Sequence, residues 1–177
     1  MAHKMYKSNH QKPMFTSDEA AGYHTADGRI IKPDDKVMYA SDFDMIHNYQ
    51  PYYTDDISLL TQSKKGLDAR AALDFLSLSG FTQDEFQETF KTTVKTIQNH
   101  VNKQLTLDAA LSEKLLKSFA LFDKGLEVFG SAKSFYQWLG APAYGLGNQL
   151  PFDLMDTITG INLIEEELIR LEYGDLA

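Results

Sequence analysis

Residues 81–101 read FTQDEFQETFKTTVKTIQNHV, and this stretch decides the fold class. Thr82 and Glu85 stand three residues apart as a capping box, in which each side chain can accept a hydrogen bond from a backbone amide at a helix start. Phe86 and Phe90 lie one helical turn apart and face the same way. The first half of the stretch therefore predicts a short helix.

A second short helix follows the first after a tight turn. Thr93 can cap it, and the apolar residues Val94, Ile97 and Val101 predict one buried face. Two helices joined by a three- or four-residue turn are typical of the helix-turn-helix, whose second helix lies in the DNA major groove. Amide side chains can pair with adenine, and lysines can reach guanine or phosphate. The candidate DNA contacts are Lys91, Thr93, Lys95, Gln98 and Asn99.

The same spacing also fits an ordinary helical hairpin whose polar face meets only water. Many helix-turn-helix domains have a small residue in the middle of the first helix and a glycine at the turn, because the two helices cross closely there. This chain has Gln87 and Lys91 at those places, which counts against DNA binding. Spacing alone leaves both interpretations open.

The apolar pattern on both sides of this stretch predicts helices from Gly66 to the end of the chain. Gly80 and Gly130 suit the residue after a helix, where a left-handed conformation is common. In the last helix we expect Glu165–Glu167 to be mostly solvated. Apolar residues at helical spacing predict four further helices, at about residues 67–79, 108–129, 132–139 and 158–172.

Residues 1–60 show no sustained helical period, so we expect an irregular N-terminal extension. Within it, Arg29–Lys32 and Lys36–Tyr39 are short β-prone runs around a Pro-Asp-Asp turn, which predicts a small hairpin or two extended arms. Three tyrosines surround Pro51 and indicate extended chain docked on a surface. The predicted organisation is an all-α protein with this extension, a helix-turn-helix-like domain at 61–104 and a C-terminal helical domain at 105–177.

Composition excludes several classes of protein. The chain has 177 residues and a net charge of −8, but residues 61–104 hold 6 basic and 5 acidic groups, a net charge of +1. Its lack of cysteine excludes disulfides and cysteine–zinc sites. No apolar run approaches the roughly 20 residues that cross a bilayer, and no apolar leader follows Met1. We therefore expect a soluble cytoplasmic protein without a membrane partner.

The sequence offers little support for enzyme chemistry. The Gly145–Gly147 run lacks both the preceding strand and the third glycine of a phosphate-binding loop. The five histidines show no common ligand spacing: His3, His10, His24, His47 and His100. We expect no catalytic set, no metal site and no cofactor.

Several spaced tryptophan, proline and glycine positions fall within residues 135–155. A Trp-Leu pair is followed by a proline three residues on, a Leu-Gly pair and a second proline that opens a short helix. The matching residues are Trp138, Leu139, Pro142, Leu146, Gly147, Pro151 and Leu154. This pattern resembles the toxin-binding domain of the Xre/MbcA/ParS antitoxins. The resemblance extends over about residues 66–177, and the helix-turn-helix pattern falls where the family carries its own.

The resemblance implies a non-catalytic role in a type II toxin–antitoxin system. Members of this family are dimers that bind and neutralise a RES-domain toxin, an enzyme that consumes NAD⁺ or uses it to ADP-ribosylate a target. In the family, the C-terminal end of the antitoxin projects toward the toxin's active-site cleft. Carried over, this end consists of Glu172, Tyr173, Gly174, Asp175, Leu176 and Ala177.

Many family members also bind their own operator and repress the operon. Their recognition helices are often rich in arginine, whereas residues 91–103 contain three lysines, one histidine and no arginine. Fewer phosphate contacts weaken DNA binding. The sequence thus predicts toxin neutralisation with operator binding in addition. The alternative is a helix-turn-helix transcriptional regulator without a toxin partner.

Overall fold

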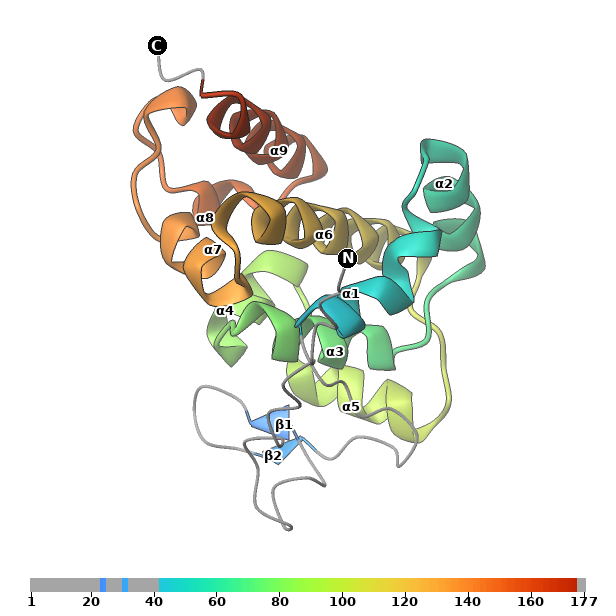
Figure 1. Ribbon diagram of the computed structural model, residues 1–177. Coiled ribbons are helices and arrows are strands. Elements are labelled where there is room, and N and C mark those ends of the chain that lie inside the picture. Colours follow the sequence, from blue (N-terminus) through green and yellow to red (C-terminus); the bar gives the residue numbers. More distant parts are fainter. Residues whose placement is uncertain (1–22, 25–29, 32–41, 175–177) are drawn as a thin grey trace, which may run out of the picture.

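The computed structural model describes residues 23–24, 30–31 and 42–174 (Figure 1). Over this part of the chain the fold is all-α, as the sequence predicts. Two short 3₁₀ helices, η2 (Gln50–Tyr52) and η3 (Tyr144–Leu146), accompany the α-helices. The α-helices are α1 (Asp42–Tyr49), α2 (Asp56–Lys65), α3 (Arg70–Ser79), α4 (Gln83–Phe90), α5 (Val94–Asn102), α6 (Ala109–Phe129), α7 (Ala132–Leu139), α8 (Pro151–Leu154) and α9 (Ile158–Glu172).

Side-chain caps define where the helices begin. The capping box at Thr82 and Glu85 is confirmed, with both of its hydrogen bonds present. Thr93 caps α5 and Ser131 caps α7, each by accepting a hydrogen bond from the amide three residues on. Gly130 ends α6 in the left-handed conformation, at φ +78°. These local interactions place the helix ends where the sequence predicts them.

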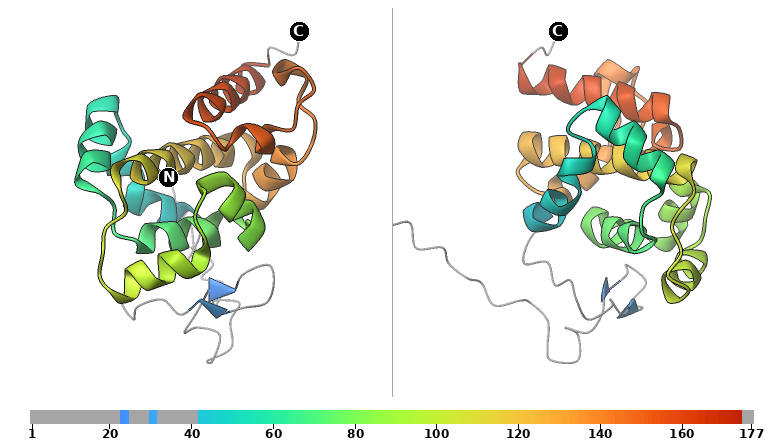
Figure 2. Two further views of the ribbon diagram at one scale, coloured as in Figure 1. Left: turned by 180° about the vertical axis from the view of Figure 1, so that it is seen from behind. Right: turned by 90° about the vertical axis from the view of Figure 1, so that its right-hand side faces the viewer.

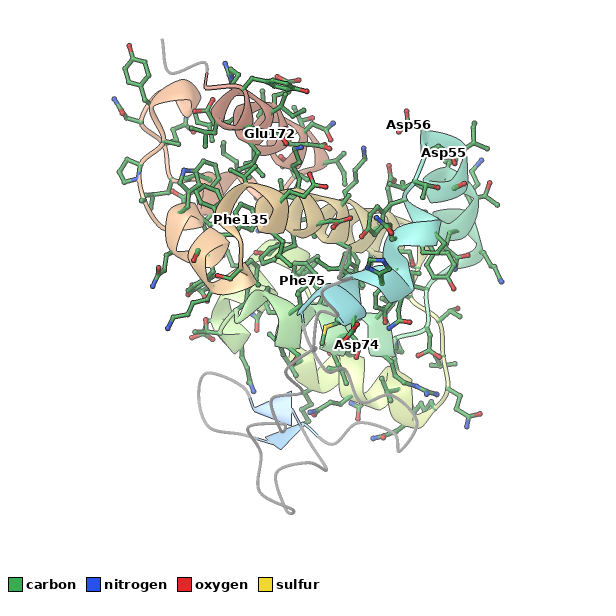
Figure 3. All side chains as sticks on the ribbon, viewed as in Figure 1. Asp55, Asp56, Asp74, Phe75, Phe135 and Glu172 are labelled. Atoms are coloured by element: carbon green, nitrogen blue, oxygen red, sulfur yellow. The ribbon has the colours of Figure 1, made fainter. Side chains whose placement is uncertain are left out.

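Helix α6 forms the centre of the molecule. In Figures 1 and 2 it runs between α9 on one side and α3, α4 and α5 on the other. Phe75 of α3 makes edge-to-face contacts with four other rings, among them Phe119 and Phe122 of α6 at centroid distances of 5.2 and 5.1 Å. The ring of Phe135 in α7 also packs against the ring of Phe122, at a centroid distance of 4.9 Å. Figure 3 labels Phe75 and Phe135, which belong to one connected apolar core.

The prediction of irregular chain up to residue 60 is wrong for residues 42–60. This part of the chain forms α1, η2 and the first half of α2. Met45 and Ile46 are buried, and the ring of Tyr49 stacks on Phe119 at 4.2 Å. Tyr49 of α1 and Tyr53, which follows η2, pack against the core, whereas Tyr52 is exposed. The tyrosines therefore come from short helices and their ends, and not from extended chain. Helix α1 spans only eight residues, too few for its apolar spacing to stand out in the sequence.

A two-residue antiparallel ladder pairs β1 (Tyr23–His24) with β2 (Ile30–Ile31). The sequence predicts that the isoleucine run is extended, and the ladder confirms it. The other predicted arm, Lys36–Tyr39, lies outside the described residues, as does the turn before it.

Candidate functional site

An ion-pair cluster anchors the C-terminal end of α9 to α6. Lys124 of α6 donates to the Glu172 carboxylate at 2.7 Å and to Glu127 at 3.0 Å. Hydrogen bonding to Glu172, and then to Glu127, raises the pKa of Lys124 above its ordinary value, so the lysine stays charged. Figure 3 labels Glu172 on α9 beside α6. This pairing links the last residue of α9 to α6.

The predicted toxin contacts differ in how the structure places them. Glu172 is held by Lys124, whereas Tyr173 is 80% exposed. Gly174 adopts the left-handed conformation at φ +71°, which ends the helix and redirects the chain. Residues 175–177, which are Asp175, Leu176 and Ala177, lie outside the described residues. An exposed tyrosine on an anchored helix end is a geometry that suits contact with another protein.

The segment between α7 and α8 packs against α9 through an acidic side chain. Glu167, expected in solvent with its neighbours, is buried instead, with 7% of its surface exposed. Its Oε1 accepts a hydrogen bond from the Gly145 amide at 3.2 Å, and its Oε2 pairs with Arg170 at 3.0 Å. Sequence reasoning missed this role because the contact joins residues 22 positions apart. The only sequence signal is Gly145 itself, within the family-like pattern.

The α4–α5 pair presents the predicted DNA contacts unequally. Lys95 and Asn99 are exposed, and Thr93 is exposed while its hydroxyl caps α5. Gln98 is half-buried, which limits its reach. Lys91 ends α4 and pairs with Asp156 at 3.5 Å. The structure therefore places these residues along the turn and on α5, with Lys91 engaged by an acidic neighbour.

The two departures from the usual helix-turn-helix pattern are accommodated. Lys91 adopts the left-handed conformation, at φ +54°, that a glycine would take at the turn. Gln87 is exposed, so its side chain is not trapped where the two helices cross. The large residues at these places therefore do not prevent the helix pair from forming.

Lys114 of α6 links the end of α4 to the start of α9. Its ammonium group donates to the backbone carbonyls of Thr89 and Asp156 and lies 5.8 Å from the ring centroid of Phe90. Burial lowers the pKa of Lys114, while the nearby Asp156 charge opposes that shift. A single lysine on a helix surface gives no sequence sign of such a role, since its acceptors come from distant segments.

The described residues contain no group of three or more histidine, aspartate or glutamate side chains placed to hold a metal ion. None of the helices within 42–174 is both long and apolar enough to span a membrane.

Comparison with known proteins gives the class. A sequence model described as the antitoxin Xre/MbcA/ParS C-terminal toxin-binding domain matches residues 124–174. A second, described as the antitoxin Xre-like helix-turn-helix domain, matches residues 58–118. The chain thus joins the two parts of an antitoxin, and it belongs to the Xre/MbcA/ParS antitoxin family. This finding confirms the resemblance seen in the sequence. No curated protein matches the chain.

Both matches include part of α6, and one apolar core runs through the helices on either side of it. The predicted domain limits at residues 61, 104 and 105 stay predictions.

Proposed function

We propose that this antitoxin neutralises a RES-domain, NAD⁺-consuming toxin by placing residues 172–177 at the toxin's active site. It acts in the cytoplasm as a protein inhibitor without catalytic residues of its own. The observation that carries the proposal is the pinned end of α9, where Lys124 holds Glu172 while Tyr173 remains exposed.

A short tail on an anchored helix suits a concave site. Because the helix fixes the origin of the tail, only a few residues lose conformational freedom when they enter a cleft. The tail carries a carboxylate at Asp175. Cationic groups that hold the phosphates of NAD⁺ would attract this carboxylate. The tail would then block the cleft by occupying it.

The test is a chain that ends at Glu172. We expect the truncated protein to fold, because Tyr173 is mostly exposed, but to lose protection of cells that express the RES-domain toxin encoded beside it. Toxin NAD⁺ consumption with purified proteins gives a second readout. Ile57→Ala on α2, which removes an apolar side chain that is 72% exposed, serves as the control and should protect fully. Full protection by the truncated protein would refute the blocking mechanism.

A second role, operator binding, is favoured by the match of the helix-turn-helix model to residues 58–118. In this proposal a dimer places α5 of each copy in successive major grooves and represses the operon. Lys95 and Asn99 reach the DNA from the exposed side of α5. A regulator of this kind without a toxin partner is the alternative function.

Operator binding is tested by the variant Lys95→Ala/Asn99→Ala on operator DNA at low salt. We expect weaker binding, and a smaller salt dependence because one phosphate contact is lost. The control is Lys64→Ala, which removes an exposed lysine from α2. If the wild-type protein does not bind the operator even at low salt, the DNA-binding role is wrong. If it binds but the native toxin does not bind the antitoxin, the alternative function is favoured.

A further inference from the structure

The loop between α7 and α8 has its own backbone framework. Residues Ala143 and Gln149 close its base, where the Ala143 amide donates to the Gln149 carbonyl at 3.0 Å. The Asn148 amide donates back to the Ala143 carbonyl at 2.9 Å. Gly147 and Asn148 both adopt left-handed conformations, at φ +67° and +60°. The loop is therefore a closed turn whose shape is set by its backbone.

The side chains of this loop divide into an anchor and a tip. Ala143 and Leu146 are buried and hold the underside of the loop on the protein. Tyr144 lies between them in the sequence and is 79% exposed. A large aromatic ring that the core does not use, on a loop that the backbone holds in place, can bind a partner at a low cost in conformational entropy.

Glu167 holds this loop against α9. Its carboxylate accepts the Gly145 hydrogen bond and also fills the space beside that glycine. A Cβ atom at residue 145 would lie 1.9 Å from the Glu167 Oε2, so a side chain there would displace the carboxylate. Figure 1 shows η3 as the orange turn beside the end of α9 from which the tail departs. The residue that positions the loop therefore belongs to the helix that carries the tail.

We propose that Tyr144 is a second anchor for the toxin, outside the tail, and that Glu167 is the residue that positions it. This inference rests on the proposed toxin-neutralising function. Its occupant is the toxin, because Tyr144, Glu167 and Tyr173 all lie within the segment 124–174 that matches the toxin-binding domain. Tyr144 and Tyr173 are also the two most exposed large apolar side chains of the described residues, at 79% and 80%.

The experiment measures the Kd for the purified toxin encoded beside the antitoxin. We expect Tyr144→Ala to weaken binding by at least about tenfold, the size typical of an interface anchor. Tyr144→Phe, which keeps the ring, shows how much of that loss belongs to the hydroxyl. Ile57→Ala, similarly exposed but on α2, should leave the Kd unchanged.

Glu167 is tested by variants that separate positioning from stability. Glu167→Ala should weaken toxin binding, whereas Glu167→Gln should largely restore it, since an amide oxygen can still accept the Gly145 hydrogen bond. Both substitutions remove the ion pair with Arg170. A loss of stability that comes from this ion pair should therefore lower the unfolding midpoint of both variants, whereas only Glu167→Ala should weaken toxin binding. In a Tyr144→Ala background, Glu167→Ala should have little further effect on the Kd, because the two residues act as one unit.

The outcomes separate this inference from the proposed function. If the wild-type protein does not bind the toxin, the proposed function fails. If the wild-type protein binds and Tyr144→Ala binds equally well, the second anchor is wrong while the tail mechanism stands. If Tyr144→Ala leaves toxin binding intact but disrupts self-association, the loop belongs to an interface between two copies and the inference is overturned. Additive effects of Tyr144→Ala and Glu167→Ala would refute the positioning role.

Discussion

Helix α6 contains one glycine in its interior, Gly125, where α7 packs against it. The structure explains why an alanine would not serve there, although alanine favours helices. A Cβ atom at residue 125 would lie 2.4 Å from two carbon atoms of the Phe135 ring. Carbon atoms pack at about 3.5–4.0 Å, so the ring would have to move by about 1 Å or more. We therefore expect Gly125→Ala to destabilise the protein.

The magnitude follows from two opposing effects. Replacing an interior glycine by alanine stabilises a helix by about 1 kcal/mol. Overpacking a core costs about 1–3 kcal/mol, and the upper end applies because Phe135 is fully buried between the rings of Phe122, Phe129 and Trp138. The expected net loss is about 2 kcal/mol, which lowers Tm by about 4–8 °C in a chain of this size.

Urea and thermal unfolding of the purified variants would measure this loss. The control is Gly140→Ala, because a Cβ atom there would meet only carbonyl oxygens, at 3.7 and 4.0 Å. Its expected change is within about 0.5 kcal/mol. Phe135→Leu in the Gly125→Ala background should relieve the clash, so the two changes together cost less than their sum. A Gly125→Ala variant more stable than the wild type would show that the reasoning about this contact is wrong.

Three further predictions concern the scaffold. Thr82→Ala removes the cap of α4 and should lower the free energy of unfolding by about 1 kcal/mol in urea titrations. Trp138→Ala should lower the free energy of unfolding by about 2–3 kcal/mol, as thermal unfolding would measure. This is less than the loss expected for a fully buried tryptophan, because the Trp138 ring is only partly buried against Phe129 and Phe135. Burial raises the pKa of the Asp123 carboxyl. The native state therefore holds this proton at a higher pH than the unfolded chain does, and the free energy of unfolding falls as the pH rises between the two pKa values. Asp123→Asn removes this pH-dependent loss. The difference in free energy of unfolding between the variant and the wild type should therefore shift in favour of the variant from about pH 3 to pH 7, which urea unfolding at both pH values would measure.

The features that the sequence predicted correctly are local ones. The caps at Thr82, Thr93 and Ser131 involve residues three positions apart, and the long helix α6 repeats its apolar residues over 21 residues. A cap or a helical period can therefore be recognised from residues that are close together in the sequence. The family pattern around Trp138 also depends on spacing within one short segment, and the comparisons confirm it.

The features that the sequence could not predict depend on contacts between distant segments. Glu167 looked like part of a solvated acidic face, yet it is buried because the loop around Gly145 folds back onto it. Helix α1 was missed because its stability comes from Met45, Ile46 and Tyr49 packing on other helices, and not from its own periodicity. For the candidate site, the sequence identified which end of the chain to examine but not the residues that hold it in place.

The two proposed binding faces lie on different sides of α6. In the views of Figures 1 and 2, α5 lies on one side of α6 and the end of α9 that carries Glu172 lies on the other. A toxin on the α9 end and DNA along α5 would therefore contact different surfaces. Lys114 binds the carbonyls of Thr89 in α4 and Asp156 before α9, and Lys91 at the turn pairs with the Asp156 side chain. These contacts join the helix pair to the start of α9, whereas Glu172 and the proposed toxin contacts lie at the other end of that helix.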